Sequence, residues 1–143
     1  MPRLEALPSG TTLFIDANIF LEHFLGRRAA CTSFLERVWQ RDVLGVTSVS
    51  VLAEVRHGLL RAEASARFHL PTRKILRYLR DHPESLAALS EARHALLELQ
   101  RWPLRIVHVT RGQFWRACHI SERDGLLTND ALHIAVMRAH RLH

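Results

Sequence analysis

The chain is predicted to fold as an α/β protein, a three-layer α/β/α domain around a central parallel sheet, and two features of the sequence carry this prediction. Three short segments of apolar or β-prone residues, 12–15, 43–46 and 105–109, have the length of buried strands. Longer segments with apolar residues every three or four positions, typical of helices, separate them. Strands that alternate with helices favour parallel pairing through right-handed crossovers.

The first strand and the helix after it have clear boundaries. Pro2 and Pro8 oppose regular structure near the N-terminus, so segment 12–15 is the first expected strand. The helix that follows is short and ends at Gly26, which suits the left-handed conformation common at helix C-termini. Its apolar face consists of Ile19, Phe20, Phe24 and Leu25.

A helix, a strand and a longer helix follow. Apolar residues three and four positions apart predict a helix across 31–38. Segment 43–46 is the second strand. The hydroxyl groups of Thr47, Ser48 and Ser50 are suited to cap the helix after it, which carries apolar residues as far as Leu60.

The second half of the chain is mostly helical. Residues 71–100 are expected to form a helical hairpin, with a break near Pro83, before the third strand at 105–109. Thr110 is the expected N-cap of the next helix, and Gly125 separates that helix from the last one, which we expect at 130–140.

Size and composition bound the remaining possibilities. The 143 residues, 48% of them hydrophobic, suffice for one domain with its own core, expected to span residues 1–143. No segment approaches the roughly 18 apolar residues of a membrane-spanning helix, and the N-terminus lacks the layout of a signal peptide. Cys31 and Cys118 are expected to be separate thiols, not a disulfide or a metal knuckle. These features predict a cytoplasmic protein.

The charge of the chain is basic and is carried almost wholly by arginine. The formal net charge is +6, the pI is about 10.9, and Lys74 is the only lysine. Because a guanidinium binds phosphate with two hydrogen bonds and stacks on bases, one interpretation is a polyanionic partner. The other is that arginine replaces lysine because of genome base composition, so the charge is supporting evidence only.

Three acidic residues lie where a chain element meets the carboxyl edge of the predicted sheet, the edge at which ligands bind in open α/β sheets. Asp16 ends the first strand, Glu54 lies on the inward face of the helix after the second strand, and Asp130 begins the last helix. Each has an ordinary alternative explanation: a helix cap, a buried salt bridge to an arginine, and compensation of a helix dipole.

The coincidence of the three acids favours a metal site over these separate explanations. Clustered carboxylates repel one another unless a cation holds them, and hard oxygen ligands suit Mg²⁺ or Mn²⁺. Such a site generates a nucleophile from bound water and shields the charge of a phosphate. Among the histidines, only His133, one turn after Asp130, is placed to share a cation with it, and the favoured interpretation is that His133 packs near the site or donates a hydrogen bond. The sequence contains no glycine-rich phosphate loop, HExxH or GxSxG motif.

Three segments resemble, in order, the motifs of the PIN-domain family, and most closely its VapC-type toxin branch from prokaryotic toxin–antitoxin pairs. They are Leu13-Phe14-Ile15-Asp16-Ala17-Asn18, Thr47-Ser48 through Glu54, and Leu127-Thr128-Asn129-Asp130-Ala131-Leu132-His133-Ile134-Ala135. The resemblance implies a PIN fold and a Mg²⁺- or Mn²⁺-dependent endoribonuclease that cleaves structured cellular RNA, often transfer or ribosomal RNA.

The same resemblance implies roles for individual residues and partners. Asp16, Glu54 and Asp130 match the metal-binding acids of the family, and Asn18 and Thr128 occupy places where small polar residues support those acids. It also implies a homodimer and a cognate antitoxin protein that covers the active-site groove.

The sequence departs from the family pattern at its C-terminal end. The family's last helix is normally followed by a strand, a turn with a fourth acid and a final strand, whereas this sequence ends at His143. We therefore expect a sheet without the C-terminal strands, in which the strand 12–15 lies at an edge. Two hypotheses follow: a metal-dependent ribonuclease toxin, or a non-catalytic shortened PIN scaffold that binds RNA or an antitoxin. RNA cleavage with and without metal separates them.

Overall fold

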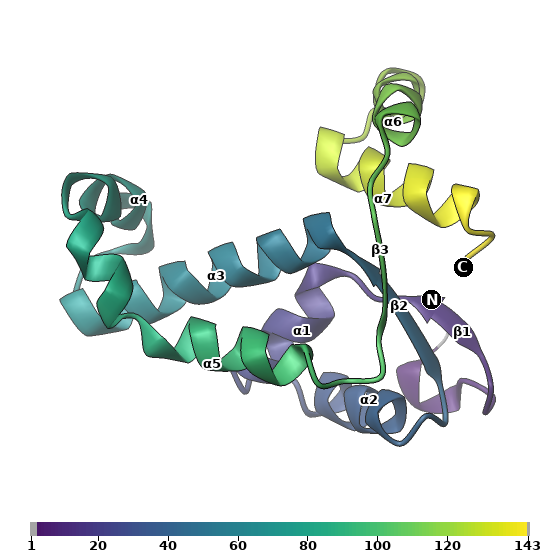
Figure 1. Ribbon diagram of the computed structural model, residues 1–143, viewed down its shortest axis with the longest axis horizontal. Coiled ribbons are helices and arrows are strands. Elements are labelled where there is room, and N and C mark those ends of the chain that lie inside the picture. The colour runs from purple at the N-terminus through teal and green to yellow at the C-terminus, as the bar shows by residue number, and fades with distance from the viewer. Residues whose placement is uncertain (1–2, 143) are drawn as a thin grey trace.

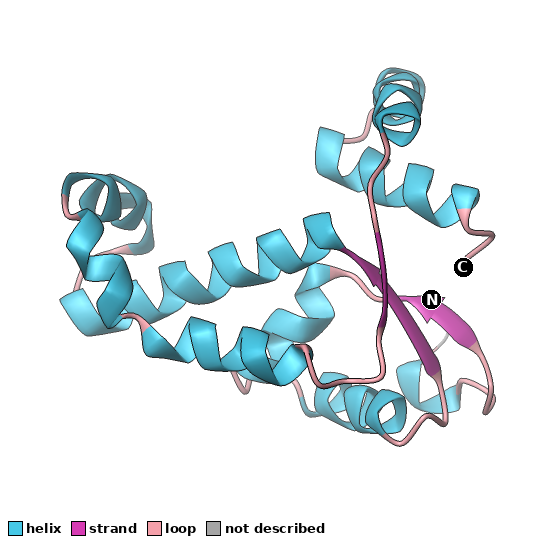
Figure 2. Cartoon of the chain, in the orientation of Figure 1, coloured by secondary structure: helices cyan, strands magenta, loops and turns pink. Residues whose placement is uncertain are grey.

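A computed structural model describes residues 3–142 and contains the predicted parallel sheet. Its three strands are β1 (Thr12–Phe14), β2 (Leu44–Ser48) and β3 (Arg105–Val107), in the order β1-β2-β3 with both pairings parallel. Figure 2 shows the strands side by side in magenta. Phe14 pairs with Val46, and Val46 pairs with Arg105.

β1 lies at one edge of this sheet, as expected from the sequence. Its three residues are only partly buried, whereas all of β2 after Leu44 is buried, because β2 lies between two neighbours. Pairing extends one residue beyond β1, since the Ile15 amide donates to the Val46 carbonyl at 2.8 Å. This bond places the chain at Asp16 directly beside the carboxyl end of β2.

Helices cover both faces of the sheet (Figure 1). On one face, Ile15 packs in the main core with α1 (Ala17–Phe24) and α2 (Ala29–Trp39). On the other face, Val46 packs with Val136 of α7 (Thr128–Ala139), and α7 in turn packs on α6 (Arg111–Asp124). The predicted three-layer α/β/α architecture is confirmed.

α2 approaches β2 closely at Gly45. A Cβ at this position would lie 2.8–2.9 Å from side-chain atoms of Ile15, Val38 and Leu104, too close for any of them to remain in place. Gly45 therefore allows the sheet and α2 to pack against each other.

The helical hairpin that extends away from the sheet is formed by α3 (Val49–Phe68) and α5 (Ser90–Leu99), and not within residues 71–100 alone as predicted, because α5 packs back on α3. α4 (Thr72–Asp81) and the short 3₁₀ helix η2 (Pro83–Ala88) connect these two helices, and a further 3₁₀ turn, η1 (Leu4–Ala6), precedes the sheet. In Figure 1, α5 runs beside α3, and α4 lies at the end farthest from the strands. α3 begins directly after β2, so its first turns lie at the carboxyl edge of the sheet.

Most helix ends lie where capping residues and glycines in the sequence predicted them. The Ser48 hydroxyl accepts a hydrogen bond from the Val51 amide, and Thr110 forms a capping box with Gln113. Gly26 and Gly125 adopt positive φ angles of 64° and 67° after α1 and α6. α7 begins at Thr128, two residues earlier than predicted.

Both cysteines are free thiols, in agreement with the sequence-based prediction. Cys31 is a buried residue of α2, and burial raises the pKa of its thiol. Cys118 on α6 is partly buried. Across residues 3–142, no helix has both the length and the apolar character needed to cross a membrane.

Candidate metal centre

Asp16 occupies the N-cap position of α1, but its side chain does not cap the helix. The backbone at Asp16 is extended, and its carboxylate makes no hydrogen bond to the first amides of α1. The side chain is 48% exposed. The capping explanation for Asp16 is therefore not met, and the carboxylate is free to bind another group.

Glu54 lies in the second turn of α3, and no arginine compensates its charge. The arginine ion pairs within residues 3–142 are formed at Asp42, Asp81 and Asp124. Glu54 Oε1 is buried without a hydrogen-bond partner, although the side chain as a whole is 32% exposed. A buried carboxylate oxygen without a hydrogen-bond partner destabilises the folded state, so a bound cation is the kind of ligand that would compensate this atom.

His133 of α7 completes the group. Its Nε2 atom lies 3.2 Å from Glu54 Oε1 and 3.7 Å from Asp16 Oδ1. The 3.2 Å contact lacks hydrogen-bond geometry, so Nε2 and Glu54 Oε1 both have no partner, and Nδ1 has none either. The imidazole is only 7% exposed and lies against Phe14 of β1, with ring centroids 5.8 Å apart.

The three side chains form a group of the right size for one cation. One ligand atom each from Asp16, Glu54 and His133 lies within 4.8 Å of the other two. An ion with bonds of about 2.0–2.3 Å separates its ligand atoms by roughly 3–4.6 Å, so the present spacing needs little contraction. Two carboxylates also balance the charge of a divalent ion. The donor set therefore fits a divalent metal.

Asp130, the third predicted acid, is not a member of this close group. It lies in the first turn of α7, is exposed, and lines the same hollow as Asp16 and His133. The imidazole of His133 reaches both Asp16 and Glu54, whereas Asp130 is exposed at the start of α7. The helical spacing of three residues between Asp130 and His133 was the available signal, since it places both on one side of α7.

The two predicted supporting residues lie at different places. Asn18, in the first turn of α1, lines the hollows on both sides of the acids. Thr128 is the first residue of α7 and is exposed. Of these two residues, only Asn18 lines the hollows next to the acids.

Two hollows of different character flank the centre. One, of about 570 Å³, contains Asp16, Asp130 and His133 and is otherwise mostly apolar, with β1, α1, α2, α7 and the η1 segment around it. The other, of about 580 Å³, follows α3 and is lined by polar groups that include Asn18, Ser50, Glu54, His57, Arg61 and Asn129.

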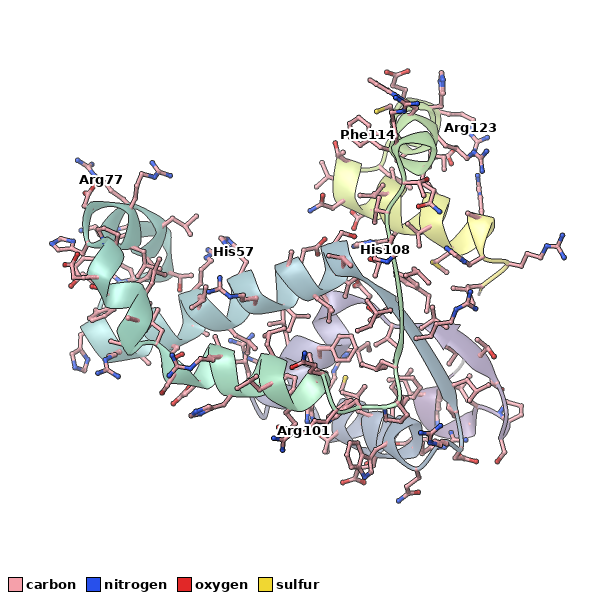
Figure 3. All side chains as sticks on the ribbon, in the orientation of Figure 1. His57, Arg77, Arg101, His108, Phe114 and Arg123 are labelled. Carbon is pink, nitrogen blue, oxygen red and sulfur yellow. The ribbon has the colours of Figure 1, made fainter. Side chains whose placement is uncertain are left out.

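Residues 54, 57, 58 and 61 lie along one face of α3, and Figure 3 shows His57 projecting from that helix. Arg61 is half-buried, its Nε has no partner, and none of the ion pairs found in residues 3–142 includes it. The polar groove thus carries basic groups directly beside Glu54.

Comparison with known proteins agrees with the α/β fold described above. A family model described as PIN domain matches residues 13–143. No curated protein sequence matched the chain.

Three solved structures share the fold at 14–21% sequence identity. VapC20 of Mycobacterium tuberculosis, described as a toxin that cleaves the sarcin–ricin loop, is 21% identical with a TM-score of 0.60, over 91% of this chain and 84% of that one. VapBC2 of Rickettsia felis bound to a promoter DNA fragment is 14% identical with a TM-score of 0.58, over 92% and 84% of the two chains. A toxin–antitoxin complex of Klebsiella pneumoniae is 21% identical with a TM-score of 0.50, over 93% and 82%.

Proposed function

Since the chain belongs to the PIN-domain family, we propose that it is a metal-dependent endoribonuclease and the toxin of a toxin–antitoxin pair. The observation that carries this proposal is the convergence of Asp16 and Glu54 at the carboxyl edge of the sheet, without a helix cap or an arginine to explain either. Members of this family are typically nucleases, and the solved structures that share this fold include VapC toxins.

The metal would be Mg²⁺ or Mn²⁺, held by Asp16 and Glu54. When bound, such an ion lowers the pKa of a coordinated water and offsets negative charge on a phosphate. Asp130, exposed at the rim of the apolar hollow, is the third proposed acid of the site. Asn18 and Thr128 are proposed to support the acids, Asn18 from between the two hollows.

The substrate is proposed to be RNA, with transfer and ribosomal RNA as the first candidates, and to bind along the polar groove of α3. Arg61 supports this placement because it lines the groove and takes part in none of the ion pairs found in residues 3–142, which leaves its positive charge to attract a phosphate. His57 provides a second donor one turn closer to Glu54. The net charge of +6 adds a favourable long-range attraction for any polyanion.

The proposed protein partners are a cognate antitoxin and a second copy of the chain in a homodimer. Two of the structures that share this fold are toxin–antitoxin assemblies, which supports the first of these partners. An antitoxin that covers the acids would inhibit cleavage by excluding RNA from the same groove.

The test is cleavage of purified transfer and ribosomal RNA with Mg²⁺, with Mn²⁺, and with a chelator. We expect cleavage only with metal, and none by the Asp16→Asn variant. Metal-independent cleavage would contradict the proposal. RNA binding without any cleavage would instead favour the non-catalytic scaffold.

A further inference from the structure

We infer that His133 binds the metal ion directly through Nε2, and that the site therefore holds Mn²⁺ more tightly than Mg²⁺. The inference rests on the proposed function, since it requires a divalent ion between Asp16 and Glu54. It adds a nitrogen ligand to a site that the three acids alone would make entirely of oxygen.

The burial of His133 is the first observation behind this inference. His133 is 93% buried as a residue, yet neither ring nitrogen has a hydrogen-bond partner within residues 3–142. Burial of an unpaired polar group is unfavourable, so the position of this ring calls for a ligand. The ring is packed against Phe14, which holds it in the site.

The direction of the ring is the second observation. Nε2 points at the two carboxylates, 3.2 Å from Glu54 Oε1 and 3.7 Å from Asp16 Oδ1. An imidazolium that only neutralised these acids would donate an aligned hydrogen bond to one of them, but the closer contact lacks that geometry. A cation shared by His133 and the two acids would instead give a partner to both buried atoms that lack one at this contact, Nε2 and Glu54 Oε1.

The ligand set determines which ion binds better. Mg²⁺ prefers oxygen ligands and loses its bound water molecules reluctantly, whereas imidazole nitrogen favours first-row transition ions. Mn²⁺ accepts both the carboxylates and the imidazole. In a site with two carboxylates and one imidazole, the preference for Mn²⁺ over Mg²⁺ therefore comes from His133, the one nitrogen ligand.

The experiment uses the full chain with Mn²⁺ or Mg²⁺ and no RNA. Pulsed electron paramagnetic resonance of bound Mn²⁺ should show hyperfine coupling to an imidazole nitrogen. The coupling should disappear in His133→Gln and persist in His119→Ala, which removes an exposed histidine from α6. Calorimetric titration should show that His133→Gln loses at least about tenfold of the preference for Mn²⁺ over Mg²⁺.

The outcomes separate this inference from the proposed function. Bound Mn²⁺ without nitrogen coupling in the wild-type chain would overturn the role of His133, while metal-dependent RNA cleavage would still stand. Failure of the wild-type chain to bind Mn²⁺ or Mg²⁺ would overturn both. Because the wild-type spectrum is decisive by itself, the test holds even if His133→Gln does not fold.

Discussion

A carboxylate oxygen of Asp16 and one of Glu54 lie within 4.8 Å of each other, and no lysine or arginine within residues 3–142 forms an ion pair with either residue. Like charges at this distance destabilise the folded chain unless a cation lies near both. The pair comes from two elements, the end of β1 and the second turn of α3, which only the fold brings together. This arrangement makes opposite predictions for activity and for stability.

Replacement of Asp16 by Asn or of Glu54 by Gln should lower metal-dependent RNA cleavage by at least about ten- to a hundredfold, because loss of a direct ligand should cost no less than loss of its supporting shell. We expect a loss of similar size for Asp130→Asn. In metal-free buffer, Asp16→Asn and Glu54→Gln should melt at the wild-type temperature or above it, because like-charge repulsion is relieved. Single-turnover cleavage and thermal unfolding measure the two effects.

Glu122→Gln is the matched control, since Glu122 is an exposed acid on α6. It should change neither cleavage nor melting. Full activity in Asp16→Asn would contradict the assignment of Asp16 as a metal ligand.

Metal should stabilise the wild-type chain in proportion to its occupancy. A ligand that binds only the folded state adds about 2.7 kcal/mol at a concentration of about a hundred times Kd. The melting temperature should therefore rise as Mn²⁺ is added, fall back when a chelator is added, and respond little in Glu54→Gln. Equal shifts in wild-type and variant would place the bound metal elsewhere.

The sequence predicted the sheet well because its strands are marked locally. Short apolar segments between helical periods identified all three strands, and Ser48 and Thr110 form the expected caps from residues only three positions away. Asp16 and Glu54 were predicted for the same reason, since each is tied by position to the carboxyl end of a strand.

The rotation of α7 and the contacts of Glu63 depend on tertiary packing and could not be predicted from the sequence. Ala131 and Ala135 pack against α6, and Val136 packs against the sheet. This rotation of α7 turns His133 toward Asp16 and leaves Asp130 exposed. Helical spacing places residues 130 and 133 on one side but does not fix how the helix is rotated about its axis. The contacts of Glu63 were missed because their partners are 28 and 29 residues away.

Arg61→Ala should weaken RNA binding and reduce its dependence on salt. If Arg61 neutralises one phosphate of a single strand, the slope of log affinity against log salt should fall by about 0.7. Arg77→Ala is the control, because Arg77 lies on α4 with a side chain that is 88% exposed, at the end of the hairpin far from the strands (Figure 3). Equal slopes for wild-type and Arg61→Ala would move the RNA out of the α3 groove.

Glu63→Ala should destabilise the hairpin. Glu63 is buried on α3, and its two carboxylate oxygens accept hydrogen bonds from the Glu91 and Ala92 amides at 3.2 and 3.1 Å. These amides belong to the first turn of α5, so the carboxylate caps that helix from outside. Unpairing them should lower the free energy of unfolding by about 1–3 kcal/mol, measured by urea titration.

Glu63→Gln retains one acceptor oxygen and should lose less stability than Glu63→Ala. Identical unfolding curves for the wild-type chain and Glu63→Ala would show that the contact is not stabilising. Cleavage well below the melting temperature should be the same in all three proteins, since Glu63 lies outside the proposed metal site.

Arg37 ties the N-terminal segment to the domain through a pH-sensitive contact. Its Nε donates to Asp42 Oδ2 at 2.6 Å, and its terminal nitrogens donate to the carbonyls of Leu4 and Leu7, two residues that line the apolar hollow beside the metal centre. A hydrogen bond from Ser9 and the contact with Arg37 hold the pKa of Asp42 below the ordinary value of an aspartate side chain.

A carboxyl group with a lowered pKa stabilises the fold above the unfolded pKa, and this stability is lost as the pH falls through the folded pKa. Asp42→Asn should therefore be less stable than the wild-type chain at neutral pH, and the difference should shrink as the pH is lowered below the ordinary pKa of an aspartate side chain. Urea titrations of both proteins across this range measure the difference. A difference that stays constant with pH would show that Asp42 does not couple protonation to folding.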